Sequence, residues 1–351
     1  MIPTYLYTEV REINEDFRIK KRDSEFLSEA YQILGFEKKA ERVFKCGGFL
    51  AFSHEIEDGI INPDGKLYQA NFCKDRLCPT CTWRRSLKIF GQISQIMGVL
   101  GNDYSYLFLT LTVPNCKPDD LKRVLREMYQ GRTRLFRRKE TRIVYGVISV
   151  CEITFNRRDN TFHPHLHNIL AVSKSYFGRE YIRQKDWQRL WYEAYYYNNL
   201  PRGRYEKVEL PDKIIIKREV KDPGYMPGLP IVDVRKVKAK VEDDFGSVVA
   251  EVAKYSVKSS DYLFEDRELM TEIVKHLSID LSGMRMLSLS GVFREAYQKL
   301  NLDDIEDENV DLIHINEKWN PIVAHLITKF HWKAGCYVYD DSYIIEPNTP
   351  L

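Results

Sequence analysis

Three histidines within five residues, followed directly by an apolar run, constrain this chain more than any other feature. Residues 162–167 read Phe-His-Pro-His-Leu-His, and residues 169–172 are apolar. This pattern predicts a buried strand, along which side chains alternate, so His163, His165 and His167 should share one face. Two imidazoles on one rigid strand form half of a metal site. The alternative is a strand end with solvated histidines, but only eight histidines occur in the whole chain.

A second strand, predicted over residues 145–154, supplies a candidate carboxylate. The short polar link between it and the histidine strand favours a hairpin. That pairing would bring Glu152 level with the histidines. A carboxylate beside two imidazoles, with coordination positions left open, suits Mn²⁺ or Mg²⁺ acting on phosphate oxygens. The alternative is that Glu152 is an ordinary surface residue.

The cysteines indicate a second, structural metal site. Cys78 and Cys81 have C-x-x-C spacing, Cys73 is close by, and Cys46 is a plausible fourth ligand across a hairpin. Four thiolates suit tetrahedral zinc and leave no open position for chemistry. His54 is an alternative ligand, and a redox pair or unrelated buried thiols are alternative interpretations. An odd total of seven cysteines points to a reducing cytoplasm rather than to a disulfide framework.

Charge is unevenly distributed along the chain. The net charge is only +2, yet residues 117–142 contain ten Lys or Arg against four Asp or Glu. A basic segment in a near-neutral protein is compatible with a phosphate-binding face. Arg137 and Arg138 end the helix predicted there. Arg84 and Arg85, next to the cysteines, either contact phosphates or form an ordinary helix surface.

Several classes of protein are not expected. The N-terminus lacks the pattern of a signal peptide, and no apolar run is long enough to span a membrane. We therefore expect a cytoplasmic protein with no membrane partner. No glycine-rich nucleotide loop is present, so we expect no built-in ATPase motor.

A helix predicted over residues 245–262 carries a candidate nucleophile. Glu251 and Tyr255 are four residues apart and so are neighbours on one face, with Lys258 three residues further on. A tyrosine between a carboxylate and an ammonium group can act as a nucleophile with a base and an electrostatic stabiliser. Considered alone this signal is weak, because the chain has 22 tyrosines.

The remaining elements complete an α+β chain in three parts. We expect an N-terminal helical region with a zinc knuckle over residues 1–100, a nuclease domain over 101–265 and a mixed α/β tail over 266–351. Further predicted elements are strands at 106–113, 231–237, 309–319 and 336–343, and helices at 119–136, 184–197 and 284–300.

Four motifs together resemble a known family, the rolling-circle replication initiators of Gram-positive plasmids, within the HUH endonuclease superfamily. The motifs are the Cys-Pro-x-Cys-x-Trp-Arg-Arg element within residues 73–85, the strand at 108–115, His-Pro-His-Leu-His at 163–167, and Glu-Val-Ala-Lys-Tyr-Ser-Val-Lys at 251–258. They occur in the family's order and cover roughly residues 40–300. The histidine motif alone also occurs in relaxases and transposases.

The resemblance implies an active-site metal bound by His165 and His167, with Glu152 as the third ligand and His163 left open. It implies an antiparallel-sheet HUH fold with the histidines on a central strand, flanking helices and the tyrosine helix packed across the sheet. The expected cofactors are therefore Mn²⁺ or Mg²⁺ at the active site and a structural Zn²⁺.

The resemblance also implies roles in DNA cleavage. Tyr255 would attack a phosphodiester of single-stranded or hairpin-extruded plasmid origin DNA, forming a 5′-phosphotyrosyl link and a free 3′-hydroxyl primer. Glu251 would activate water for the terminating cleavage, and Lys258 would stabilise the charge. Tyr262, seven residues after Tyr255, is a second candidate nucleophile.

The implied partners are origin DNA, a host helicase and a DNA polymerase. The tail would recognise the origin or form oligomers such as a homodimer. Two alternatives stay open at this point: another HUH enzyme, such as a relaxase or transposase, or a non-catalytic zinc-dependent DNA-binding regulator.

Overall fold

The chain folds into two compact units of mixed helix and antiparallel sheet. The computed structural model describes residues 4–178, 180–196, 205–210, 214–219, 231–237, 246–253, 257–315 and 319–349. Unit 1 consists of Met1–Gly91, Lys258–Ser278 and Asp303–Leu351, and unit 2 of Gln92–Val257 and Ile279–Leu302. The predicted α+β class is confirmed. The predicted domain ranges are each continuous in sequence, whereas both compact units combine separate segments of the chain. The ranges concern segments that fold independently, so they stay a proposal.

Unit 2 is built on a five-stranded antiparallel sheet, here sheet B, in the order β10-β5-β6-β4-β9. Its strands are β10 (Leu287–Gly291), β5 (Val144–Asn156), β6 (Thr161–Val172), β4 (Ser105–Thr112) and β9 (Val232–Lys236). The histidine strand, β6, is therefore central, as predicted. β5 and β6 form the expected hairpin, because a polar turn joins two apolar runs. A separate two-stranded sheet pairs β7 (Tyr205–Leu210) with β8 (Ile214–Glu219).

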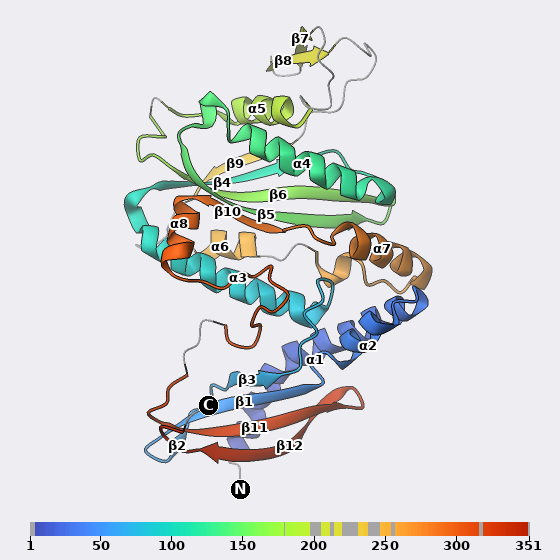
Figure 1. Ribbon diagram of the computed structural model, residues 1–351, viewed down its shortest axis with the longest axis vertical. Helices are drawn as coiled ribbons and strands as arrows, with labels where there is room; N and C mark the ends of the chain where they lie inside the picture. The colour runs from blue at the N-terminus through green and yellow to red at the C-terminus, as the bar shows by residue number, and fades with distance from the viewer. Residues whose placement is uncertain are drawn as a thin grey trace. The chain divides into compact units, whose positions relative to one another are not determined.

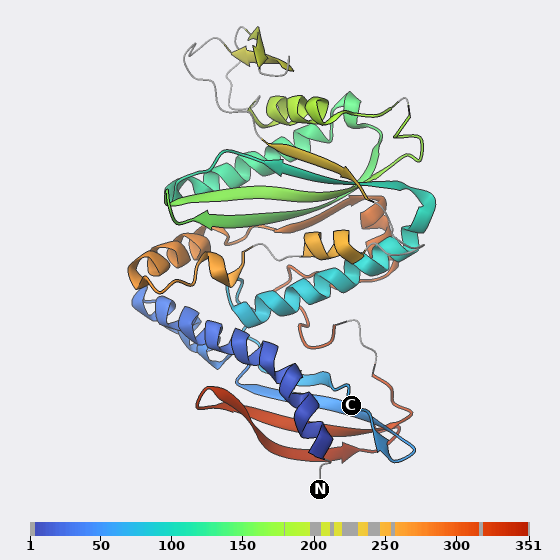
Figure 2. The ribbon, with the colours of Figure 1, turned by 180° about the vertical axis from the view of Figure 1, so that it is seen from behind.

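Helices cover both faces of sheet B (Figure 1). One face packs against α4 (Leu121–Leu135) and α5 (Gln184–Tyr196), and the other against α6 (Gly246–Ala253) and α8 (Val292–Lys299). The apolar stripe of α4 and the fully buried Trp187 and Trp191 of α5 fill the first interface. The view from behind shows the same division of helices between the two faces (Figure 2).

Unit 1 contains a second antiparallel sheet, here sheet A, in the order β12-β11-β1-β2 with β3 also paired to β1. Its strands are β1 (Phe49–Glu57), β2 (Ile60–Ile61), β3 (Lys66–Ala70), β11 (Ala324–Lys333) and β12 (Cys336–Ile345). Helices α1 (Thr4–Ile33), α2 (Glu37–Lys45) and the first turns of α3 (Pro79–Leu100) complete it, and α7 (Arg267–Asp280) begins in it. Phe17 of α1 packs against Phe52 and Phe330 of this sheet, forming its core.

Three predicted elements differ from the structure. Of the helix expected over 245–262, α6 covers Gly246–Ala253, and the described residues 257–262 form no α-helix but a 3-10 turn at Ser259–Asp261. Residues 284–300 were expected to form one helix, but β10 occupies the first half and α8 the second. Gly291 has φ of 54°, which ends the strand and starts the helix. The strand expected over 309–319 is absent from the described residues 309–315 and 319, and strand β11 lies further along instead. Within the described ranges, no helix combines the length and the apolar character that crossing a membrane requires.

Candidate functional site

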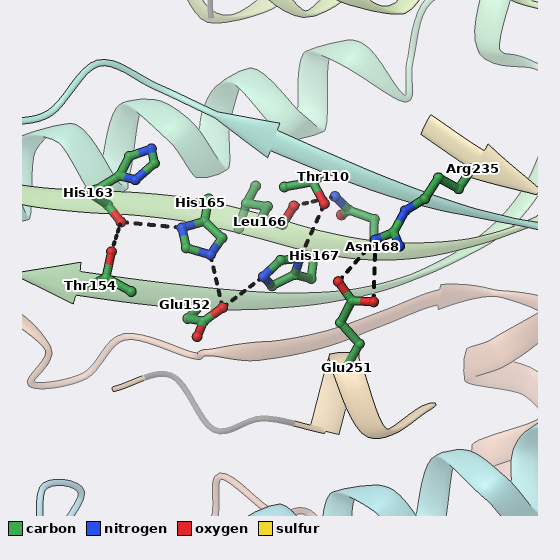
Figure 3. Close-up of polar contacts among 10 residues, drawn as sticks. All are labelled: Thr110, Glu152, Thr154, His163, His165, Leu166, His167, Asn168, Arg235 and Glu251. Carbon is green, nitrogen blue, oxygen red and sulfur yellow. Dashed lines mark hydrogen bonds and ion pairs between the residues drawn. The ribbon is translucent and has the colours of Figure 1, made fainter. Parts of the chain in front are cut away.

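Glu152, His165 and His167 converge on one point of sheet B (Figure 3). The β5–β6 register places Glu152 directly opposite His165, and Val150 opposite His167. Oε2 of Glu152 lies 2.9 Å from Nε2 of His165 and 2.8 Å from Nε2 of His167. An ion with ligand bonds of about 2.1 Å places neighbouring ligand atoms roughly 3 Å apart. The three atoms therefore have the spacing of ligands around one small cation.

The outer nitrogen of each ring has a partner, and for His165 that partner indicates which atom is free to bind a metal. Nδ1 of His165 lies 3.3 Å from the carbonyl oxygen of His163. A carbonyl oxygen only accepts, so Nδ1 donates to it and Nε2 of the neutral ring carries a lone pair. Thr110 lies 3.3 Å from Nδ1 of His167 through its Oγ1. With Nε2 of both rings unprotonated, the two nitrogens and the carboxylate oxygen offer three electron pairs to one point, so this donor set fits a divalent metal ion.

His163 is not part of this three-ligand cluster. Its ring centroid lies 5.4 Å from that of His165, and Figure 3 shows the ring directed away from Glu152. Burial lowers the pKa of His163, and the neighbouring His165 adds to this effect. The backbone carbonyl of His163 contributes instead, because it orients His165. The assignment of the His163 ring as a metal ligand stays a prediction.

Helix α6 brings Glu251 to the same face of the sheet. It packs on β5 and β6 through Val249, Val252 and Ala253, which are buried. Arg235 of β9 donates from Nη2 to both carboxylate oxygens of Glu251, at 3.0 and 3.3 Å.

Arg235 also connects Glu251 to the candidate metal ligands. Its guanidinium lies 4.8 Å from the ring centre of Phe108, whose ring stacks on His167 at 5.5 Å. It is held from a second side by Asp233, 2.9 Å from Nε. A continuous row therefore runs from the carboxylate of Glu251 to an imidazole of the metal cluster.

The structure describes only one of the two candidate tyrosines. Tyr255 lies outside the described residues, and its role stays a prediction. Tyr262 is fully buried in unit 1, where its hydroxyl donates to the carbonyl of Leu77. Burial raises the pKa of Tyr262 well above its usual value. A buried, neutral phenol that is already hydrogen-bonded is poorly suited to attack DNA. Lys258 is exposed at the start of the unit 1 segment, and its role also stays a prediction.

The four cysteines gather into one cluster in unit 1. Their sulfur atoms all lie within 4.8 Å of one another. Sγ of Cys81 lies 3.5 Å from that of Cys46 and 3.7 Å from that of Cys73. Ligands about 2.3 Å from a tetrahedral zinc ion are roughly 3.8 Å apart, so this cluster fits Zn²⁺. The backbone amide of Cys73 donates to Cys46, and that of Lys74 to Cys81, as expected around metal-bound thiolates.

The close packing of the four thiols shifts the pKa values of Cys46 and Cys78 in opposite directions. Burial raises the pKa of Cys46 well above its usual value. Burial also opposes ionisation of Cys78, but hydrogen bonds from the other three thiols and from Ser24 lower its pKa. His54 does not join this cluster: its Nδ1 lies 3.2 Å from the carbonyl of Asn62 in sheet A.

The predicted DNA-contacting arginines near the cysteines are buried. Arg84 donates to the carbonyls of residues 312 and 313 at 2.8 and 2.6 Å. Arg85 donates to those of residues 74 and 75 at 2.6 and 3.2 Å. These bonds tie the cysteine turn to the C-terminal segment of unit 1. Their assignment to DNA stays a prediction, and this packing favours a bracing role instead.

The arginines at the end of α4 divide into two kinds. Arg137 is exposed. Arg138 is paired with Glu193 of α5, and its Nε lies 3.8 Å from Glu140. The charge of Arg138 is therefore largely balanced within the protein, whereas Arg137 remains available to a phosphate.

Sequence reasoning missed Arg235, Phe108 and Thr110 as parts of the site. The alternation of residues 231–237 did predict a strand, and it placed Arg235 and Asp233 on one face. What it could not indicate was that this strand pairs with β4, which sets Arg235 directly opposite Phe108.

Comparison with known proteins gives a consistent family. A family model described as "Replication protein" matches residues 64–209 and 225–338. A protein named "Protein rep" from Bacillus amyloliquefaciens is 35% identical over 355 residues, covering 90% of this chain and 94% of that protein. One of the same name from Lentilactobacillus hilgardii is 32% identical, with 92% and 94% covered, and one from Streptococcus pneumoniae is 31% identical, with 87% and 85% covered. No solved structure matches this chain.

Proposed function

Since the chain belongs to this replication protein family, the plasmid initiators of Gram-positive bacteria that its motifs resemble, we propose that it nicks one strand of a plasmid origin to start rolling-circle replication. The observation that carries the proposal is the cluster of Glu152, His165 and His167 on a central strand. A non-catalytic DNA-binding protein has no need for three converging ligands with coordination positions left open.

The cluster and α6 supply different parts of the reaction. A divalent ion, Mn²⁺ or Mg²⁺, bound by Glu152, His165 and His167 would neutralise charge on the non-bridging oxygens of the scissile phosphate. Thr110 and the carbonyl of His163 keep the two rings in the orientation that this requires. The packing of α6 on β5 and β6 supports the proposal, because α6 carries Glu251, the first residue of the nucleophile motif.

Tyr255 is the proposed nucleophile. Its hydroxyl oxygen attacks phosphorus, the bond from phosphorus to the 3′ oxygen breaks, and that oxygen leaves as a 3′-hydroxyl. The proton that the tyrosine hydroxyl loses is balanced by the proton that the leaving 3′ oxygen gains, and a 5′-phosphotyrosyl diester replaces the original diester. Because one diester is exchanged for another, no ATP is consumed, which fits the absence of a nucleotide-binding loop in the sequence.

The remaining roles follow from this step. Lys258 would stabilise the charge of the tyrosinate or phosphate. Glu251, held by Arg235, would activate the water that terminates the reaction. A polymerase would extend the free 3′-hydroxyl, and a host helicase in the cytoplasm would separate the strands.

The test is a covalent adduct. The protein is incubated with Mn²⁺ and a labelled single strand containing the origin, then denatured and separated by electrophoresis. We expect a labelled protein band that Tyr255→Phe lacks and that the control Tyr181→Phe, which alters an exposed tyrosine, retains. Glu152→Gln should reduce the band by about a hundredfold, since it removes one charged ligand.

Two outcomes would contradict the proposal. An adduct that persists in Tyr255→Phe would show that another residue is the nucleophile. Binding without cleavage under any divalent metal would favour the non-catalytic regulator.

A further inference from the structure

A pocket on the opposite face of sheet B has no role in the reaction above. It has a volume of about 410 Å³ and lies between α4 and the segment of residues 282–288, entirely within unit 2. Ser288, in its wall, pairs with Ser149, one position from the Val150 that pairs with His167. Because side chains alternate along strands, Ser288 points away from the histidines. Figure 1 shows α4 on the face of sheet B that lies opposite α6.

The lining of this pocket is strongly cationic. Lys122, Arg126, Arg132 and Arg285 all contribute to it, and no Asp or Glu does so among the described residues. Within the described ranges, neither Lys122 nor Arg126 takes part in a salt bridge. By contrast Arg123, on the same helix but outside the pocket, is paired with Asp120 and Glu127.

Arg132 is the most telling of these cations. Its side chain is half-buried, yet its described contacts are neutral: Nη1 donates to Oγ of Ser288 at 2.6 Å, and its guanidinium lies 5.5 Å from the ring centre of Tyr129. Burial lowers the pKa of Arg132. Holding a partly desolvated cation beside neutral groups is costly unless an anion joins it. The site is therefore built as half of an ion pair.

We propose that this pocket binds a backbone phosphate of DNA outside the cleaved segment, by charge and not by base sequence. Guanidinium groups match phosphate oxygens with two parallel hydrogen bonds. The volume exceeds what an isolated phosphate fills and admits a sugar–phosphate unit. The lining also contains Tyr129 and Met284, so the pocket is not lined by cations alone. The inference rests on the proposed function, because a nicking enzyme must hold the DNA that flanks its cleavage site.

The test is the salt dependence of DNA binding, which needs no cleavage. A fluorescent duplex of random sequence is titrated by anisotropy without added divalent metal, over a range of salt concentrations. Arg126→Ala and Arg132→Gln should each weaken binding and reduce the magnitude of the slope of log K against log salt by about 0.9, or by about 0.7 with a single strand. Arg123→Ala removes the same charge from the same helix and should leave the slope unchanged, because that charge is already paired.

The outcomes separate this proposal from the nuclease proposal. If the slopes measured for Arg126→Ala and Arg132→Gln equal the slope for Arg123→Ala, the phosphate-binding proposal is overturned. Because Arg126 is exposed, Arg126→Ala should fold even if Arg132→Gln does not. Inorganic phosphate that competes with DNA only in chains with an intact pocket would support it. Phosphate binding without any change in the DNA slope would make the pocket a small-anion site and overturn it. If these variants reduce the slope but the unaltered chain never nicks DNA, the phosphate-binding proposal is supported and the nuclease proposal is refuted.

Discussion

At the scale of single residues, Arg235 links two groups with different proposed tasks. It holds the carboxylate of Glu251 on one side and covers Phe108, which stacks on His167, on the other. Glu251 is on the short helix α6, so its side chain could adopt several rotamers without this contact. We therefore propose that Arg235 is a positioning residue, which would hold the carboxylate of the proposed base without itself reacting.

Replacing Arg235 by alanine should slow the terminating hydrolysis more than the first nick. Displacing a base by about 1 Å costs up to roughly a hundredfold in rate, so we expect a tenfold to hundredfold slower release of the covalent adduct. The measurement is a time course of adduct formation and decay on an origin strand. Greater adduct accumulation in Arg235→Ala than in the unaltered protein is the expected result.

Two variants serve as controls for this prediction. Asp233→Asn removes the charge of the second carboxylate beside Arg235 while leaving the contact with Glu251, so hydrolysis should change little. In a chain that already carries Glu251→Ala, adding Arg235→Ala should have no further effect on adduct decay, since the two act through one group. Additive effects would mean that Arg235 acts on the phosphate directly and not through Glu251.

At the scale of elements, the cysteine cluster connects three segments that are separate in sequence. Cys46 follows α2, Cys73 lies in the loop after β3, and Cys78 and Cys81 lie at the start of α3. A structural zinc ion contributes on the order of 10 kcal/mol to folding, which is comparable to the total stability of a typical domain. Cys78→Ser should therefore lose about one zinc ion per chain and lower the melting temperature, as measured by metal analysis and thermal unfolding.

Cys336→Ser is the matched control for the cysteine prediction. Cys336 is exposed at the start of β12 and lies outside the cluster, so its variant should retain the zinc. A chelator should reproduce the effect of Cys78→Ser in the unaltered chain. If no zinc is found in the unaltered chain, the four thiols are simply buried core residues.

How well each element could be predicted depended on how much of its pattern was local. Strand β6 was predictable because alternation and the following apolar run agree over twelve residues. The helix prediction for residues 284–300 was wrong, because the five-residue strand β10 and the eight-residue helix α8 together have the apolar pattern of one amphipathic helix. Only its pairing with β5, from Leu287 opposite Val150 to Gly291 opposite Gly146, makes β10 a strand, and that is a tertiary contact.

At the scale of the whole molecule, pairings between distant segments limited the prediction in the same way. β1, near the N-terminus, pairs with β11 through eight positions, although some 270 residues separate them (for example His54 and Leu326). Neither strand has strict alternation, because both are buried on much of their length. The candidate site was more predictable than this fold, since its ligands lie on one hairpin, whereas Arg235 depended on the pairing of β9 with β4.

These pairings predict that the C-terminal segment is an integral part of unit 1. A chain ending after residue 320 lacks β11 and β12, so β1 loses its main partner and Phe330 leaves the core cluster. Loss of one buried Phe costs about 3–5 kcal/mol, against a typical total of about 5–15 kcal/mol. Unit 1 should therefore become sensitive to protease and lose its zinc, whereas a chain ending after residue 346, beyond β12, should retain both properties. Unchanged zinc content and melting temperature in the shorter chain would show instead that residues 321–351 are a separable tail, because sheet A would then be stable without the strand that pairs along β1.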